Sequence, residues 1–237
     1  MNATLLNYPA ALDADPFQHG SKTAVAPIDG VAIHAELFLP PDAHGLAIVI
    51  LAHDGISEPE QVDRVARAMA VQGVATLALA LFTQTETDRA ARMEQGSFEL
   101  DLSTHRLLQA TSWALRQPRT RELGIGFLST GWQASAAFIA AAQLGYAVEA
   151  VVSCAGRPDL AGNLLARVTA PTLLIVGDSD GELLAINSRA YKFLAAPKQF
   201  IVMPGKAHLL AEVDTFEPIL DSSARWFSTH LKPILRT

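Results

Sequence analysis

The amino-acid sequence predicts an α/β fold, with a mainly parallel eight-stranded sheet and helices on both of its faces. The first observation behind this prediction is an alternation of short apolar runs with longer stretches whose apolar residues repeat at helical spacing. The second is that most of the short runs are continuously apolar, as in strands buried on both faces of a sheet. The third is that 237 residues without a linker or an internal repeat suit one large domain. We expect this domain over residues 21–237, after an irregular N-terminal arm over residues 1–20.

The first half of the chain opens with a predicted hairpin. Asp29-Gly30 separates two extended runs, residues 23–28 and 31–39, and both residues of the pair tolerate the positive φ of a tight turn. A helix is expected between Pro59 and Gly73. Pro59 suits its first turn, and Gly73 suits its end. The other elements expected in this half are strands over residues 46–52 and 74–79 and a helix over residues 98–115.

The segment that organises the second half runs from Glu122 to Gly145. A short apolar run over residues 123–128 is followed by Ser129-Thr130-Gly131 and by an Ala-rich stretch of helical length. We interpret this as a strand, a sharp turn and a helix, with Ser129 at the turn and its hydroxyl exposed. Gly131 leaves room for the turn, because it has no Cβ. The other elements expected here are strands over residues 150–153, 172–176 and 199–202 and helices over residues 183–194 and 216–231.

Composition excludes several classes of function. The net charge of −6, without a basic cluster, argues against a nucleic-acid partner, and no apolar run approaches the roughly 20 residues that span a bilayer. The first residues carry no basic and apolar signal pattern, and the single cysteine, Cys154, fits a reducing compartment, so we expect a cytoplasmic protein. No CxxC, HExxH or P-loop pattern is present, so we expect neither a metal nor a cofactor. No segment indicates an interface, and the oligomeric state is therefore left open.

Three polar residues follow predicted strands in the order Ser129, Asp180, His208. In parallel sheets, ligands bind beyond the carboxyl ends of the strands, which is where these residues are expected. A serine becomes a nucleophile when a base takes its proton, and histidine, with an unperturbed pKa of about 6.5, is such a base. A carboxylate on the other ring nitrogen fixes the tautomer of the histidine. The three residues are therefore our candidate catalytic triad.

Each member of this triad also has a simpler interpretation. Ser129 with Thr130 suits an ordinary helix N-cap, and Asp180 suits a cap on the helix that follows it. Asp178 is a rival for the acid, although it lies closer to the strand end. His208 fits a surface loop equally well.

The oxyanion of a serine hydrolase needs two backbone N–H groups. One is expected from Thr130, which follows the serine, and the other from Gly55, in the loop after the third strand. Arg157 is a candidate for a substrate carboxylate, although pairing with Asp159 is the alternative, and Cys154 is expected to pack as a small apolar residue. The candidate substrate-binding residues are Asp54, Ile56, Phe127, Trp132 and Arg157.

The chain resembles the α/β-hydrolase superfamily, and within it the dienelactone-hydrolase-like enzymes without a cap domain. The resemblance spans about residues 23–231 and is densest in ILAHDGIS, ELGIGFLSTGWQASAA, VVSCAGRPDLAG, APTLLIVGDSD and VMPGKAHLL. It implies Ser129 as nucleophile, Asp180 as acid and His208 as base. It also implies hydrolysis of a small carboxylic ester or lactone through an acyl-enzyme.

The chain departs from this family at two places. Relatives have Gly-x-Ser-x-Gly at the nucleophile, whereas here Phe127 stands at the first glycine and Trp132 adds bulk after the turn. The oxyanion loop is His-Asp-Gly-Ile-Ser rather than His-Gly-x-Gly-Ser-Ser, and dienelactone hydrolase itself has a cysteine where Ser129 stands. A second hypothesis is therefore a catalytically impaired protein that binds a ligand or a protein partner. A third is another reaction on the same triad, such as thioester cleavage or acyl transfer.

Overall fold

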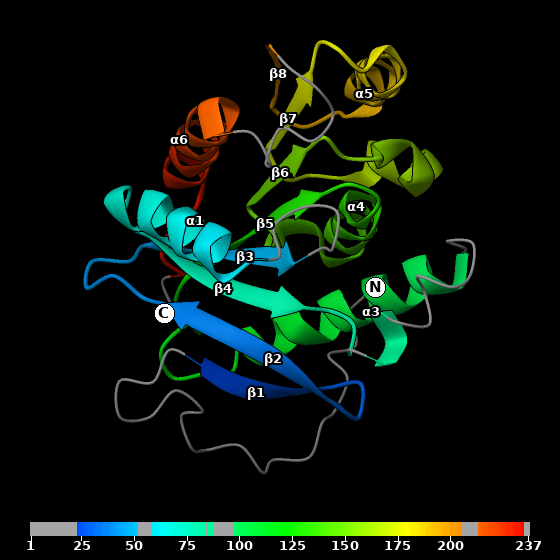
Figure 1. Ribbon diagram of the computed structural model, residues 1–237. Helices are drawn as coiled ribbons and strands as arrows, with labels where there is room; N and C mark the ends of the chain where they lie inside the picture. Colours follow the sequence, from blue (N-terminus) through cyan, green and yellow to red (C-terminus); the bar gives the residue numbers. More distant parts are fainter. Residues whose placement is uncertain (1–22, 52–57, 84, 88–96, 205–212, 235–237) are drawn as a thin grey trace.

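A computed structural model describes residues 23–51, 58–83, 85–87, 97–204 and 213–234 (Figure 1). Within these residues, one eight-stranded sheet has the strand order β1-β2-β4-β3-β5-β6-β7-β8. β2 pairs antiparallel with β1 and β4, and the other neighbours pair in parallel. The prediction of a mainly parallel eight-stranded sheet is confirmed. The strands are β1 Thr23–Ile28, β2 Val31–Phe38, β3 Gly45–Leu51, β4 Val74–Ala80, β5 Gly124–Thr130, β6 Ala150–Cys154, β7 Thr172–Gly177 and β8 Lys198–Met203.

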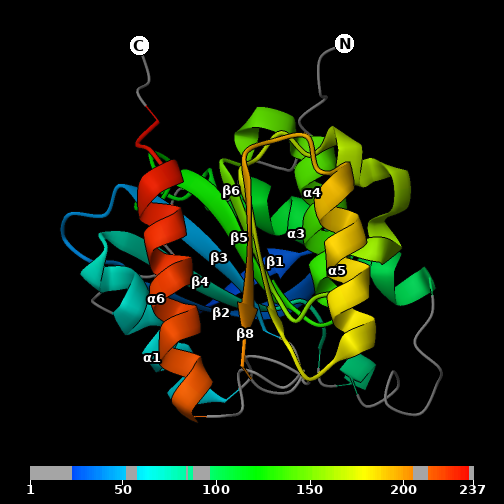
Figure 2. The same ribbon diagram turned by 90° about the horizontal axis from the view of Figure 1, so that it is seen from above.

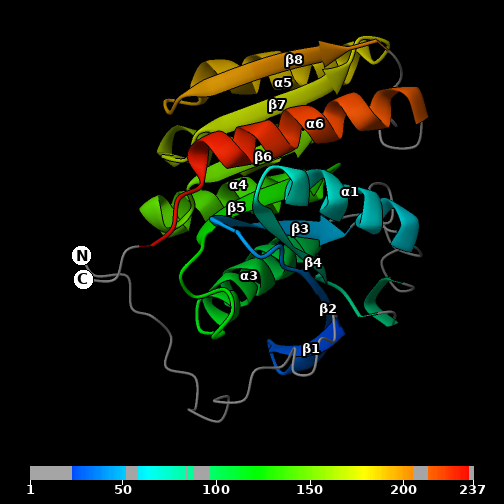
Figure 3. The same ribbon diagram turned by 90° about the vertical axis from the view of Figure 1, so that its left-hand side faces the viewer.

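The helices form a layer on each face of the sheet (Figure 2). α1 and α6 cover one face and lie side by side, and α3, α4 and α5 cover the other (Figure 3). None of the helices that the structure describes is long and apolar enough to cross a membrane. The helices are α1 Pro59–Val71, α3 Ser97–Ala114, α4 Gln133–Leu144, α5 Gly181–Phe193 and α6 Val213–His230, with 3-10 segments at η2 Gly145–Ala147 and η3 Pro158–Arg167.

The core has two parts because strand side chains alternate between the faces of the sheet. On β5, Ile125 and Phe127 belong to the cluster beneath α3 and α4, whereas Leu128 belongs to the cluster beneath α1 and α6. Phe216 and Phe227 of α6 fill the second cluster. β5 thus has a fully covered surface on each side, which explains its continuous apolar run.

The predicted hairpin is present, and its turn has the expected backbone. Asp29 and Gly30 have φ values of 53° and 72°, and β1 and β2 pair from Ile28 opposite Val31 outward. An element that the sequence did not indicate follows β6. There the chain forms η3, which buries Pro158, Ala161 and Leu165 and so gains a core contact that a turn would lack.

Gly126 of β5 is packed directly against α6. A Cβ at this position would lie 2.6 Å from Cε1 of Phe227. We expect Gly126→Ala to lower the free energy of unfolding by about 1–3 kcal/mol, because the buried ring has to shift. The control is Gly181→Ala, where a Cβ would meet nothing within 4 Å. Urea unfolding of both variants checks the prediction, and equal stabilities for the two would contradict it.

Candidate active site

β5 extends two residues further than the sequence indicated. Its pairing with β6 continues through Ser129 opposite Ser153 and Thr130 opposite Cys154. Ser129 is 0% exposed. The prediction that Ser129 lies at the turn with an exposed hydroxyl is therefore wrong. The physical reason is that β6 keeps offering backbone partners, so the strand does not end where its apolar run ends.

The turn between β5 and α4 occurs at Gly131. This residue has a φ of 53°, and Trp132 is the N-cap of α4. The carbonyl oxygen of Gly131 accepts a hydrogen bond of 2.9 Å from the N–H of Arg157, which fixes the turn to the loop after β6. A nucleophile elbow carries its nucleophile on a sharp, strained turn between strand and helix. In this chain the residue with that backbone is a glycine, which has no side chain to react.

The hydroxyl of Ser129 has no hydrogen-bond partner among the described residues, and the same holds for Ser153. Register partners on neighbouring strands share a face of the sheet, so the two hydroxyls lie on the same side. Gly156 closes tightly over this region, because a Cβ there would collide with the side chains of Ser153 and Ala134. Asn187 of α5 donates a hydrogen bond of 2.9 Å to the carbonyl of Gly156 and holds it in place. Ser129 is thus enclosed by the fold.

Phe127, which stands at the first glycine of the family motif, does not crowd the turn. It lies inside β5, opposite Ile48 of β3 and Val151 of β6, and its ring is 0% exposed. It belongs to the core cluster beneath α3 and α4. A fully buried ring offers no surface to a substrate, so the assignment of Phe127 to substrate binding is contradicted, and its place is in the core.

Trp132 is half-buried directly after the turn. Its ring lies 5.9 Å from that of Phe82, centroid to centroid, at an angle of 50°.

The oxyanion donor also has to be reassigned. Trp132 is the residue that follows the positive-φ position, whereas Thr130 is the last residue of the strand. Because the oxyanion donor of an elbow is the N–H after the nucleophile position, Trp132 replaces Thr130 as the candidate donor. The sequence signal that could have found these residues is the start of the Ala-rich helix. The two residues just before it are Gly131 and Trp132, which are the turn and the residue after the turn.

Asp180 caps α5. Its Oδ1 accepts a hydrogen bond of 2.9 Å from the N–H of Leu183, which is the simpler interpretation weighed above. Asp178 is exposed, and its Oδ1 accepts a hydrogen bond of 3.1 Å from the hydroxyl of Ser179. Both carboxylates follow β7 at the carboxyl edge of the sheet. The role of Asp180 as the acid of a triad stays a prediction, because His208 lies outside the described residues.

Arg157 pairs with Asp159. Two parallel hydrogen bonds join them, Nε to Oδ1 at 2.9 Å and Nη2 to Oδ2 at 2.8 Å. The hydrogen bond from Arg157 lowers the pKa of Asp159 below its ordinary value. This arrangement agrees with the alternative stated for Arg157, because the Nε–Nη2 edge of its guanidinium is already bound to a carboxylate.

The remaining candidates divide into two groups. Cys154 is buried, and burial raises the pKa of its thiol to about 12, in agreement with its expected role as a small packing residue. No cluster of metal-ligating side chains occurs in the part of the chain that the structure describes. The candidates that lie outside the described residues are Asp54, Gly55, Ile56 and His208.

Comparisons with known proteins give relatives of two kinds. No family model matches the chain. A curated protein of Mycobacterium tuberculosis that carries the provisional name phosphoribosyl transferase is 37% identical over 203 residues, which are 85% of this chain and 44% of that protein. The chain thus spans less than half the length of this curated relative. Est1E from Butyrivibrio proteoclasticus shares the fold at a TM-score of 0.65 and 16% identity, over 86% of this chain and all of that one.

The crystal structure of dienelactone hydrolase from Anabaena variabilis is similar in sequence as well as in fold. It is 31% identical and covers 89% of this chain and 98% of its own, at a TM-score of 0.81. Other similar folds, at 11–16% identity, are those of two esterases and of a dienelactone-hydrolase-like phosphotriesterase, and they show the same fold. Together with the sheet order and the absence of a cap domain among the described residues, this likeness places the chain in the dienelactone-hydrolase-like family of α/β-hydrolases.

Proposed function

We propose that this protein binds a small ester or lactone at the carboxyl edge of its sheet and forms no acyl-enzyme on Ser129. One observation carries the proposal: the strained turn between β5 and α4 is occupied by Gly131, whereas Ser129 is 0% exposed two residues earlier, inside β5. A hydroxyl enclosed by the sheet does not reach a carbonyl carbon at the turn. Hydrolysis by this chain therefore requires a nucleophile other than Ser129.

The binding half of the proposal is supported by the first turn of α4. The first N–H groups of a helix have no partner within the helix, and the positive end of the helix dipole lies beside them. Trp132 and Gln133 stand at this start, immediately after the turn. Such N–H groups attract carbonyl oxygens and carboxylates. The family resemblance supports the ligand class, since dienelactone hydrolase is named for a lactone.

A second candidate is a serine hydrolase in which Ser129 attacks the ester, His208 takes its proton and Asp180 orients His208. It is supported by the order of these residues along the chain and by the esterase relatives. For this reaction, the loop at Gly156, which closes over the side of the sheet that carries Ser129 and Ser153, has to move to expose the hydroxyl. The transferase name of the mycobacterial relative adds no third candidate, because the match covers only 44% of that protein.

Labelling with a fluorophosphonate, which reacts with activated serines, separates the two candidates. We expect the parent chain and Ser129→Ala to label equally weakly, because a buried hydroxyl is not activated. A serine esterase in the same reaction mixture is the positive control. Strong labelling of the parent chain that disappears in Ser129→Ala would overturn the proposal and establish the serine hydrolase.

A further inference from the structure

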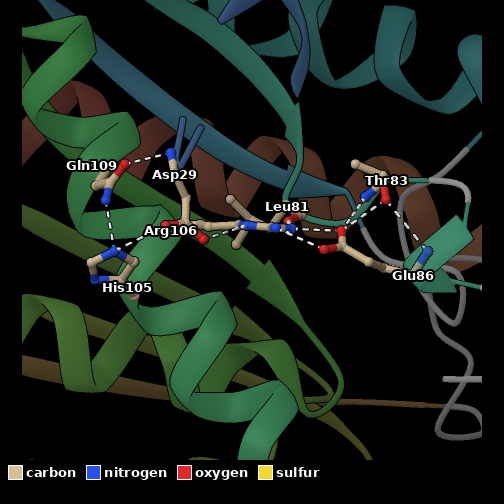
Figure 4. Close-up of polar contacts among 7 residues, drawn as sticks. All are labelled: Asp29, Leu81, Thr83, Glu86, His105, Arg106 and Gln109. Atoms are coloured by element: carbon tan, nitrogen blue, oxygen red, sulfur yellow. Dashed lines mark hydrogen bonds and ion pairs between the residues drawn. The ribbon is translucent and has the colours of Figure 1, made fainter. Parts of the chain in front are cut away.

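Arg106 of α3 is a buried cation that holds the segment after β4 (Figure 4). Its side chain is 3% exposed. Nη1 donates to the carbonyl oxygen of Leu81 at 2.8 Å and to Oε2 of Glu86 at 2.7 Å, and Nη2 donates to Oε1 of Glu86 at 2.7 Å. A planar guanidinium suits this two-oxygen arrangement, which fixes direction as well as distance.

Glu86 also binds Thr83, three residues earlier in the chain. Oε2 accepts hydrogen bonds from the N–H of Thr83 at 2.8 Å and from its hydroxyl at 2.9 Å. The hydrogen bonds from Arg106, more than any other cause, lower the pKa of Glu86 to about 2. The carboxylate therefore stays charged through the neutral range and keeps its hydrogen bonds to Thr83 and Arg106.

The other side of Arg106 is tied to the β1–β2 hairpin. Nε lies 3.5 Å from Oδ2 of Asp29, at the hairpin turn. The N–H of Asp29 donates to Oε1 of Gln109, and His105 lies 3.4 Å from Oδ1 of Asp29 (Figure 4). α3 thus contacts the hairpin at Asp29, and Arg106 of the same helix also binds the segment after β4.

Phe82 lies within the segment that Arg106 and Glu86 hold. Its ring packs on that of Trp132, next to Gly131 at the turn into α4. Both rings are half-buried, so each keeps part of its surface open. Two aromatic rings held beside the N–H groups of α4 form an apolar wall next to the place where a carbonyl oxygen would bind.

We infer that Phe82 and Trp132 determine ligand specificity by receiving a planar aromatic group bonded to the ester or lactone carbonyl, with the Arg106–Glu86 pair as the positioning device for Phe82. This inference rests on the proposed carbonyl site. The ligand class is therefore aromatic esters and lactones rather than aliphatic ones. Ring-to-ring contacts of this kind correspond to about a 3- to 10-fold gain in affinity.

The test compares two probes with the same methyl ester group, methyl benzoate and methyl acetate, by saturation-transfer NMR titration. We expect the parent chain to bind methyl benzoate more tightly. Phe82→Ala should reduce the ratio of the affinity for methyl benzoate to that for methyl acetate by about 3- to 10-fold. Glu86→Gln should reduce the ratio in the same direction, because the segment that carries Phe82 loses its charged anchor. Asp221→Asn, which removes an exposed pair with Arg225 on α6, is the matched control and should keep the parent ratio.

The outcomes separate this inference from the proposed function. If neither ester binds to the parent chain, the carbonyl site itself is refuted. If both esters bind and Phe82→Ala keeps the parent ratio, the site stands and the aromatic wall is refuted. A ratio that falls in Phe82→Ala and in Glu86→Gln, but not in Asp221→Asn, supports both the wall and its positioning by Arg106 and Glu86.

Discussion

Replacing Gly131 by serine is expected to give a protein that a fluorophosphonate labels at least about 10²-fold faster than the parent chain. The reason is the position of Gly131 at the turn between β5 and α4. Gly131 has the positive φ of a nucleophile elbow and stands directly before the start of α4, so a serine there would carry its hydroxyl at the turn. The candidate base and acid, His208 and Asp180, are already present in the sequence. A properly placed base contributes about 10²- to 10⁴-fold, which sets the expected size.

The matched control for this variant is Gly131→Ala, which introduces the same Cβ without the hydroxyl. Both substitutions place a side chain on a residue with a φ of 53°, which costs about 1–3 kcal/mol. Circular dichroism and thermal unfolding should therefore show two equally weakened but folded proteins, of which only the serine variant is labelled. A folded Gly131→Ser protein that remains unlabelled would show that the turn does not present a side chain to the site.

Replacing Glu86 by glutamine is expected to lower the free energy of unfolding by about 3 kcal/mol. The substitution leaves the guanidinium of Arg106, which is 3% exposed, without its bidentate carboxylate. Breaking one side of a buried pair typically costs about 3–5 kcal/mol, because the other charge remains desolvated. We expect the lower end, since Asp29 still lies 3.5 Å from Nε of Arg106. Urea unfolding at neutral pH measures the loss, and Asp221→Asn, at an exposed pair, should stay within about 0.5 kcal/mol of the parent.

The same pair predicts how this loss depends on pH. The folded-state pKa of Glu86 is lowered from 4.5 to about 2, so its charged form is favoured by folding. The resulting stabilisation is complete above about pH 4.5 and disappears as the pH falls through the folded-state pKa near 2. The difference in unfolding free energy between the parent chain and Glu86→Gln should therefore shrink from pH 5 to pH 2. A difference that stays constant over this range would show that the carboxylate charge is not what holds Arg106.

The sequence alone determined the architecture. Continuous apolar runs marked strands that are covered on both faces, and the Asp29-Gly30 pair marked the hairpin, because both signals depend on residues close together in the chain. The same kind of local signal gave the capping alternative for Asp180 and the pairing alternative for Arg157, which the structure supports. These interactions span two or three residues, so no distant part of the chain has to be known.

Only the tertiary structure decided where β5 ends and which residue stands at the turn that follows it. The apolar run stops at Leu128, but pairing with β6 carries the strand through Thr130, and the turn moves to Gly131. A strand ends where its neighbours stop offering backbone partners, and those neighbours are distant in sequence. The same holds for Arg106, whose partners are 20 and 77 residues away at Glu86 and Asp29 and leave no local pattern. The sequence thus indicated the end of β5 as a candidate site, whereas the contacts between strands decided that a glycine stands at the turn.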